Sequence, residues 1–402
     1  MEKRYNFRIY PNAAQEALIE KSLGCCRFVY NRYLAKRIEA YEKEHRLMGL
    51  NECGRDLTRL KRAEGYEWLS EADSNALLVA LKELDRAYKA FFRRVKSGGA
   101  PGFPKFRSKR AKSSYTSRKQ INRQNIEIEG GAIKLPKLGF VRCRVSRRPE
   151  GRILSATVMR TSSGKYFVSV CCADLRPTSL PKTGKAKGLH LGLAYILVDS
   201  EGERVENPRH FEKSEKKIAR LARALSRKSK DGKNREKARI KLARAHERVA
   251  NQRSDFLNKL TTKLVKECDV ICVRDALPRS RRSARGRGAR FAKLVSEAGL
   301  GGLMQRLRYK CEWYEKELIL VDPLFPSART CERCGFENDE VGKKSALREW
   351  DCPSCGARHE RGVNAARNVL KEGLRTGGTA GRVGTRDASD SSGASRTPAE
   401  SA

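Results

Sequence analysis

The chain of 402 residues carries 87 Lys and Arg against 47 Asp and Glu, a formal net charge of +40 at pH 7. An excess of this size repels itself unless a polyanion neutralises it, so the composition points to nucleic acid as the partner. Binding through many phosphate contacts would depend steeply on salt. A merely basic scaffold of the ribosomal type is the alternative that composition leaves open.

The sequence predicts no targeting signal and no membrane span. The first residues, MEKR, are followed by no apolar run, so we expect no signal peptide. No apolar stretch approaches the ~20 residues of a membrane span. Of the 13 cysteines, four form one spaced cluster and the others are scattered, which is typical of reduced thiols in a cytosol. We therefore expect a cytoplasmic, nucleoid-associated protein with no membrane partner.

The first quarter of the chain predicts one strand followed by helices. Residues 4–10 alternate between apolar and polar side chains, which indicates a half-buried strand. Asn12, with Gln15 three positions later, is typical of a helix start. A second helix with an apolar stripe is expected from about residue 74 to 95. We predict a helical domain over residues 11–109, inserted after the strand.

A basic segment and a group of short strands follow. Residues 93–106 interleave aromatic and cationic side chains between Gly and Pro, which suits phosphate contact and base stacking; a solvated linker is the alternative. Residues 113–180 predict several short strands. Together with the first strand they could close a small β-barrel from residues 1–10 and 110–180.

The second half alternates strands and helices. Residues 187–198, 269–275 and 318–321 read as strands, and a helical hairpin rich in Lys and Arg precedes the second of them. This order predicts an α/β domain over residues 185–370. The hairpin suits the backbone of a duplex, although a solvated coiled-coil face is the usual reading of such charges. We expect disorder in residues 371–402 and order in the Arg-rich loop at 279–290 only against phosphate.

Two CxxC pairs form the most specific local motif. Each pair is followed by a glycine, where a tight turn needs a small residue; the residues are Cys331, Cys334, Gly335, Cys352, Cys355 and Gly356. Four cysteines at this spacing predict a zinc ribbon over residues 327–358, and two unrelated CxxC pairs are the alternative. The Zn²⁺ would be structural, because four thiolates leave no open coordination position.

Taken together, these motifs resemble the TnpB family, transposon-encoded RNA-guided nucleases related to type V CRISPR effectors. The resemblance covers about residues 1–370 in order; besides the cysteines, the matching segments are 100–106, 135–139, 207–211, 233–235, 251–253, 312–314, 325–327 and 359–366. It implies an α+β multidomain fold: a wedge-type β-barrel, an inserted helical recognition domain and a RuvC-like (ribonuclease-H-like) α/β domain with the zinc ribbon. It also implies a prokaryotic protein, monomeric on each RNA. Its partners would be a guide RNA transcribed near the gene and a double-stranded DNA target with a short flanking motif.

The resemblance also locates three positions where TnpB nucleases carry metal-binding carboxylates, and here they hold His190, Arg274 and Gly362. Hydrolysis with two Mg²⁺ requires anionic oxygens, which imidazole replaces poorly and glycine not at all. Arg274 would repel the metal, since two unit charges ~4 Å apart interact by about 4 kcal/mol at an effective dielectric of ~20. We therefore expect degenerate catalytic positions, no catalytic Mg²⁺ and no enzyme activity.

The function predicted on this basis is RNA-guided, sequence-specific DNA binding without nuclease activity, with repression of transcription by occlusion of a promoter. One alternative is an RNA-guided, metal-dependent DNA endonuclease with a displaced active site, for which Asp199 and Glu360 are off-motif carboxylates. The other is the product of a decaying transposon gene that retains the fold but no role.

The resemblance implies residues that read the flanking motif, in a helix and a following segment: Ser74, Asn75, Leu78, Lys82, Tyr115, Thr116 and Ser117. Contacts to the nucleic-acid backbone are predicted for cations of the basic segments: Lys105, Arg107, Lys109, Arg110, Lys233, Arg235 and Arg253. Arg274 would pair with a strand phosphate where a metal ion binds in TnpB nucleases.

Overall fold

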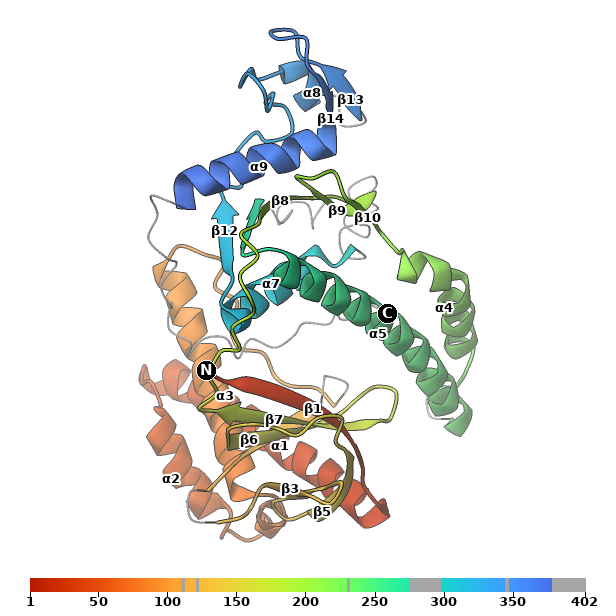
Figure 1. Cartoon of the computed structure of the whole chain (residues 1–402). Helices are drawn as coiled ribbons and strands as arrows, with labels where there is room; N and C mark the ends of the chain where they lie inside the picture. The colour runs from red at the N-terminus through yellow and green to blue at the C-terminus, as the bar shows by residue number, and fades with distance from the viewer. Residues whose placement is uncertain (110–112, 121–122, 230–231, 275–297, 344–346, 378–402) are drawn as a thin grey trace. The chain divides into compact units, whose positions relative to one another are not determined.

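The computed structural model describes residues 1–109, 113–120, 123–229, 232–274, 298–343 and 347–377 (Figure 1). The chain divides into two compact units, Met1–Arg176 with Leu221–Arg244, and Pro177–Arg220 with Ala245–Ala402. The Arg-rich loop at 279–290, and the expected tail beyond residue 377, lie outside the described residues. The domain boundaries drawn from the sequence remain predictions.

The first unit contains a seven-stranded antiparallel sheet. The strands, in their order across the sheet, are β2 (Ser113–Arg118), β6 (Arg152–Arg160), β7 (Tyr166–Ala173), β1 (Lys3–Tyr10), β5 (Gly139–Arg144), β4 (Ala132–Leu135) and β3 (Glu127–Glu129). In β1 the alternation predicted from the sequence is confirmed, because Tyr5, Phe7 and Ile9 are buried and the residues between them are exposed.

This sheet is a half-barrel rather than the closed barrel that the strand pattern suggested. Its two outer strands are β2 and β3, and no pairing joins them in the described part of the chain. β3 pairs only with β4, and β2 pairs with β6 and contacts helix α3 (Ser74–Lys96). Strand pattern alone could not decide closure, because closure depends on which distant strands meet at the edges.

Helices occupy the chain between β1 and β2: α1 (Ala13–Glu44), α2 (Leu50–Leu60), the 3₁₀ helix η1 (Glu67–Glu71) and α3. The predicted start of α1 is confirmed: the Asn12 side chain accepts a hydrogen bond from Gln15 N at 2.9 Å, and Gln15 Oε1 accepts one from Asn12 N at 3.1 Å. Helices α1 and α3 pack together. In the described residues, no helix has both the length and the apolar character that crossing a membrane requires.

The second unit contains a five-stranded sheet in the order β10 (Arg204–Glu206), β9 (Tyr195–Asp199), β8 (Ala186–Leu191), β11 (Val270–Arg274) and β12 (Glu317–Val321). β8, β11 and β12 are parallel, while β9 and β10 are antiparallel. The alternation of strands and helices expected from the sequence is observed in this unit. A parallel sheet needs cover on both faces.

The two faces of this sheet are covered by different helices. Ile271 and Val273 of β11 pack in one cluster with α5 (Lys233–Glu267) and α7 (Leu300–Tyr314). Cys272, which points to the opposite face, packs with Val369 of α9 (Arg361–Gly377). The predicted helical hairpin is formed by α4 (His210–Ser226) and α5. Helix α9 continues to Gly377, so residues 371–377 are helical and not part of a disordered tail.

Helix α9 approaches the sheet most closely at Gly188 of β8. A Cβ atom on residue 188 would lie 2.1 Å from the carbonyl oxygen of Ala366 and 2.7 Å from the backbone nitrogen of Leu370. Both contacts are with backbone atoms, which cannot move aside as a flexible side chain can. A glycine is therefore required for the helix to lie at this distance.

We predict that Gly188→Ala lowers the melting temperature of the full-length protein, because the added methyl group forces α9 away from β8. Overpacking of this kind typically destabilises by about 1–3 kcal/mol. Thermal unfolding followed by circular dichroism measures the effect. The control is Gly54→Ala in helix α2, where no atom lies within 4 Å of the added Cβ and a helical Ala gains about 0.5–1 kcal/mol. Equal melting temperatures for the two variants would refute the steric argument.

Candidate functional site

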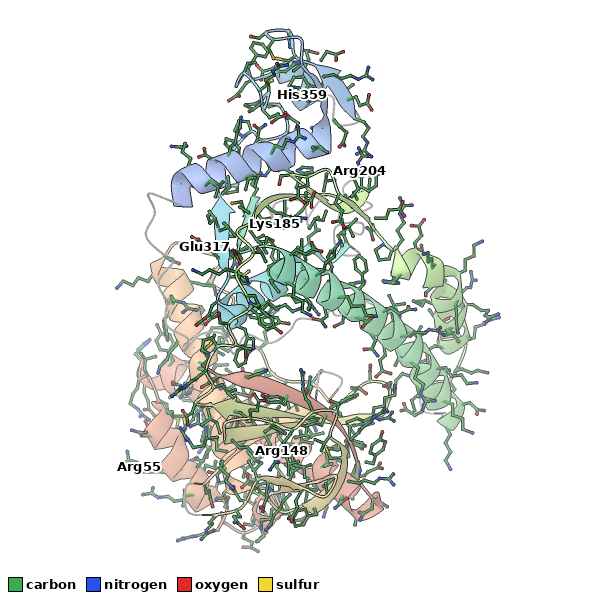
Figure 2. All side chains as sticks on the ribbon, viewed as in Figure 1. Arg55, Arg148, Lys185, Arg204, Glu317 and His359 are labelled. Atoms are coloured by element: carbon green, nitrogen blue, oxygen red, sulfur yellow. The ribbon has the colours of Figure 1, made fainter. Side chains whose placement is uncertain are left out.

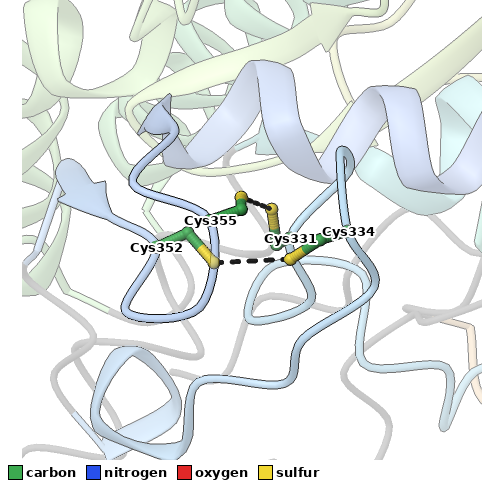
Figure 3. A group of neighbouring side chains, drawn as sticks. All are labelled: Cys331, Cys334, Cys352 and Cys355. Carbon is green, nitrogen blue, oxygen red and sulfur yellow. Dashed lines mark hydrogen bonds between the residues drawn. The ribbon is translucent and has the colours of Figure 1, made fainter.

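The four predicted cysteines lie together in the second unit (Figure 3). The Sγ atoms of Cys331, Cys334, Cys352 and Cys355 all lie within 4.8 Å of one another, with 3.7 Å between Cys331 and Cys355 and 3.6 Å between Cys334 and Cys352. Each CxxC pair lies in a tight turn, which we call a knuckle: the first is Cys331–Gly335 and the second is Cys352–Gly356. In both knuckles the glycine after the second cysteine donates its N–H to the carbonyl of the first cysteine. Each of these glycines has a positive φ, which L side chains rarely adopt.

The sulfur arrangement is compatible with a structural zinc ion. A tetrahedral ion with Zn–S bonds of about 2.3 Å places its sulfur ligands about 3.8 Å apart. The two closest sulfur pairs match that edge length. Among the described residues, this is the only group of three or more side chains with metal-binding atoms placed to share one ion. Zinc would join the two knuckles, whose own apolar cluster is small.

His359 provides a further contact to this cluster. Its Nε2 lies 3.0 Å from Cys331 Sγ, and its ring packs 4.7 Å from that of Trp350. Four thiolates already complete a tetrahedral zinc site, so His359 is placed as a hydrogen-bond partner of the Cys331 sulfur and not as a fifth ligand. Burial lowers the pKa of His359. A neutral imidazole protonated at Nε2 can donate to a thiolate, a role that sequence analysis did not find.

Strand pairing places His359 at the cluster. It lies in the short strand β14 (Arg358–Glu360), directly opposite Trp350 of β13 (Glu349–Asp351). The signal in the sequence was the position of His359 four residues after the last cysteine, but the pairing of β13 and β14 was not predicted. Helix α8 (Asp339–Lys343) was not predicted either.

Two asparagines fasten helix α9 to the first knuckle and the residues just before it. The Asn364 amide donates to Thr330 O at 2.8 Å, and its Oδ1 accepts from Glu332 N at 3.0 Å. The Asn368 amide, one turn later, donates to Ser327 O at 3.0 Å. Both asparagines are buried, so these bonds are protected from water. The ribbon therefore fixes the first turns of α9.

The three positions matched to TnpB carboxylates come together at one end of the sheet. His190 is near the end of β8, Arg274 ends β11, and these strands pair in parallel with Leu189 beside Val273. Both side chains line a small cavity of about 20 Å³. Gly362 lies in the first turn of α9. The structure thus brings together residues that are far apart in the sequence.

The environment of this cavity is cationic. Burial, together with the smaller effect of the Arg274 and Arg361 charges, lowers the pKa of His190 to about 4, so the imidazole is neutral at pH 7. Burial also lowers the pKa of Arg274. The Arg274 guanidinium donates to Phe325 O at 3.1 Å. That bond occupies a nitrogen of the group predicted to pair with phosphate, and the phosphate contact remains a prediction.

Glu360 is the off-motif carboxylate beside position 362. Its Oε1 would lie 3.1 Å from a Cβ on residue 362, and it accepts from the backbone N–H of Gly362 at 3.3 Å. It also pairs with Arg204 at 3.2 Å. Asp199, the other candidate, is buried in an ion pair with Lys187 at 2.8 Å and is not free to bind a metal ion.

The residues predicted to read a flanking motif divide into two groups. Ser74, Leu78 and Lys82 are exposed and recur every fourth residue on α3, so they share one face, and Asn75 beside them is half-buried. Thr116 is half-buried and hydrogen-bonded to Thr157 at 2.8 Å. Tyr115 and Ser117, however, are only 5% and 2% exposed. Alternate residues of β2 face the core, so these two side chains are buried in this conformation, and their contact with DNA remains a prediction.

The predicted backbone-contacting cations also differ in exposure. Lys105, Lys109 and Lys233 are exposed, whereas Arg235 and Arg253 are half-buried. Arg107 pairs with Glu83 at 2.8 Å and stacks 3.8 Å from the ring centre of Tyr30, so it has a structural role. Arg235 donates to two carbonyl groups of the α4–α5 connection. Arg110 lies outside the described residues.

Comparison with known proteins agrees with this architecture. Residues 169–276 match the IS605 OrfB family, described as "Probable transposase", residues 1–46 its helix-turn-helix domain, and residues 301–369 a Cas12f1-like TNB domain. A Streptomyces pristinaespiralis protein is 35% identical over 377 residues, covering 93% of this chain and 90% of that protein. The chain belongs to the TnpB family.

Further relatives support the same assignment. InsQ of Escherichia coli K12 is 31% identical to this TnpB-family chain, covering 92% of each. It and the Streptomyces protein are provisionally named RNA-guided DNA endonucleases. A cryo-EM structure of a Cas12f1–sgRNA–target DNA complex contains a chain with a TM-score of 0.58 at 13% identity, covering 92% of this chain and 98% of that one. This likeness shows a shared fold.

The expectation that the chain is not an enzyme is corrected by these relatives. They are named as endonucleases and match over nine-tenths of the chain. Nothing shows that the catalytic residues are replaced, because His190, Arg274 and Gly362 were assigned from the resemblance alone. The physical reason is that a carboxylate outside the motif can lie beside a motif position in space. Glu360, two residues before position 362, does so.

We predict that the purified protein contains one zinc ion per chain, measured by inductively coupled plasma mass spectrometry, and that Cys352→Ala loses it. His359→Gln should retain the metal but release it to a competing chelator at about 10–100-fold lower chelator concentration, because partners of metal ligands typically contribute that much affinity. Cys143→Ala, in the sheet of the first unit, is the control and should match wild type. Unchanged chelator resistance in His359→Gln would contradict the role of His359.

We predict that His190 makes the folding stability of the protein depend on pH. The unfolded side chain takes up a proton near pH 6.5 and the folded one only near pH 4, so folding stability is lost as the pH falls through this window. His190→Gln cannot titrate, and its stability should fall less over the same range. Denaturant unfolding at stepped pH measures this difference, and NMR titration measures the pKa of His190 directly. A pKa near 6.5 would show that the ring is solvated.

Proposed function

We propose that this TnpB-family protein binds a guide RNA and, with it, recognises a target DNA duplex beside a short flanking motif. The single observation that carries the proposal is the 35% identity to a protein provisionally named an RNA-guided DNA endonuclease, over 93% of this chain. The charge of +40 supports it, because a polyanion is required to neutralise so large an excess. The guide RNA would be transcribed near the gene.

The division of labour follows from physical constraints on recognition. Base pairing with a guide supplies sequence, while the protein holds the heteroduplex by its backbone and reads only a short motif. Exposed lysines such as Lys105, Lys109 and Lys233 suit the backbone contacts. The exposed face of α3 at Ser74 and Lys82 is our candidate for the motif contact.

Stable binding has a regulatory consequence of its own. A guide–target complex that covers a promoter excludes RNA polymerase from the same DNA, so occupancy alone represses transcription. We propose this occlusion as the output at targets where the complex remains bound. It requires a long residence time and no chemistry.

DNA cleavage is the second candidate function. The names of the relatives favour it, and so does Glu360, whose carboxylate lies beside the position of a TnpB ligand. The described residues around His190 supply this one carboxylate beside two arginines, which does not fit a two-Mg²⁺ site. We therefore derive no cleavage step through Mg²⁺.

We predict that the full-length protein, expressed with its flanking genomic DNA, co-purifies with a discrete RNA whose variable end matches a nearby DNA sequence. Sequencing the RNA identifies the guide. Mobility shift with a matching duplex and with a scrambled duplex then tests guided recognition, and only the matching duplex should bind tightly. Absence of any discrete RNA would refute the proposal.

The same complex, incubated with a matching plasmid and Mg²⁺, distinguishes the two functions. An intact but bound plasmid supports recognition with occlusion. A guide-dependent nick or cut establishes cleavage, and Glu360→Gln should then abolish the cut without loss of binding if that carboxylate contributes. Glu349→Gln is the matched control, because Glu349 is an exposed acid of the neighbouring strand β13.

A further inference from the structure

One face of helix α1 lines a concavity of about 760 Å³ that the predicted sites do not include. The lining residues recur every three to four positions, as expected for a single helical stripe; they are Gly24, Arg27, Phe28, Asn31, Arg32, Ala35, Lys36 and Glu39. We call this stripe the α1 groove. It lies entirely within the first unit, and its volume is in the range of ~300–1,000 Å³ typical of ligand sites.

Aromatic rings flank the α1 groove. Phe28 contacts Trp68 of η1 edge-on, with ring centres 5.1 Å apart, and Tyr66 at 6.0 Å. The Trp68 indole N–H donates to Gly65 O at 3.1 Å, which fixes the ring while 38% of the residue stays exposed. An indole held in place with an open face is suited to stacking on a nucleobase.

Two arginines of the α1 groove have no acidic partner among the residues that the structure describes. Arg32 lies over the rings of Tyr66 and Phe28, and its Nη1 donates to the Tyr66 hydroxyl at 3.3 Å. Its Nε is buried without a hydrogen-bond partner. A buried donor left unpaired is costly. Arg27 likewise makes no ion pair in the described chain, whereas Lys36 pairs with Asp56 at 2.7 Å.

The basic-aromatic segment predicted to contact nucleic acid is fastened to the same helix face. Asn31 donates to Arg107 O at 2.9 Å and accepts from Arg107 N at 2.7 Å. Lys105 and Phe106, just before this anchor, are exposed, Phe106 by 58%. Cations without an acidic partner and exposed rings therefore occur beside the α1 groove and on the segment attached to it.

We propose that the α1 groove holds an unpaired stretch of nucleic acid, with phosphate groups against Arg27 and Arg32 and a base stacked on Trp68. The inference rests on the proposed function, nucleic-acid binding, and assigns it a site. The ligand is single-stranded because the bases of a duplex are stacked on one another and cannot reach an aromatic ring. A phosphate group would give the Arg32 guanidinium the anionic partner that it lacks among the described residues.

The test uses full-length protein freed of RNA, with fluorescein-labelled uridine and thymidine oligonucleotides and a duplex of equal length. Anisotropy titrations over a salt series compare wild type with Arg27→Gln/Arg32→Gln. The control, Arg55→Gln/Arg59→Gln, removes the same charge from exposed positions on α2; Figure 2 labels Arg55. Trp68→Leu tests stacking. If Arg27→Gln/Arg32→Gln has a lower melting temperature than wild type, the single variant Arg27→Gln replaces it in the comparison.

For the single strands, loss of two phosphate contacts should lower the salt slope by about 1.4, and loss of one by about 0.7. Trp68→Leu should weaken binding about tenfold. A larger effect on the uridine strand assigns the groove to guide RNA, and a larger effect on the thymidine strand assigns it to displaced DNA. Both outcomes support the proposal.

Two results overturn it, and they are distinguishable. If wild type binds the oligonucleotides but the groove and control variants bind equally, or differ only on the duplex, the α1 groove is not the site and the proposed function stands. If wild type binds none of the three nucleic acids, both proposals fail.

Discussion

The structure of the second unit depends on the packing of helix α9 against the sheet and on its hydrogen bonds to the zinc ribbon. On one side its backbone meets β8 at a distance that only glycine at position 188 permits. On the other, Asn364 and Asn368 hydrogen-bond to carbonyl groups just before the first knuckle. The helix carries Gly362 in its first turn, beside Val198 of β9, which pairs with His190 of β8. Packing of one helix therefore sets the geometry of the whole candidate site.

The large positive charge does not by itself identify the residues that contact nucleic acid, because some of the arginines bind groups within the protein. Arg274 donates to the carbonyl of Phe325, Arg235 to carbonyls of its own hairpin, and Arg107 to Glu83. Arginine is suited to such roles, since its fixed fork of donors can satisfy several acceptors. Arg32 differs from these three: its Nε is buried and no acceptor meets it in the described residues. A cation of the groove that has no acidic partner is a candidate for a ligand contact, whereas net charge alone does not separate it from the structural arginines.

Much of the local structure could be predicted from the sequence, because it depends on neighbours in the chain. The strand at residues 4–10, the helix start at Asn12 and the clustering of the four cysteines follow from short-range patterns. The open half-barrel and the contact of His359 could not be predicted, since each joins segments distant in sequence. The stripe of the α1 groove lies on one helix, but the rings beside it come from Tyr66 and Trp68, and their contact with Phe28 could not be predicted. Tyr115, which the family resemblance assigned to DNA contact, is buried because alternate residues of its strand face the core, and its DNA contact remains a prediction.

The candidate catalytic site shows the same limit most clearly. Matching three positions to a family motif identifies side chains, but metal binding depends on where oxygens converge, and Glu360 reaches position 362 from outside the motif. The same carboxylate accepts the N–H groups that begin α9, and the ribbon holds the next turn through Asn364. Loss of zinc would release that turn and with it the position of Glu360. The ribbon, although it contributes no strand to the five-stranded sheet, is therefore a structural part of the site.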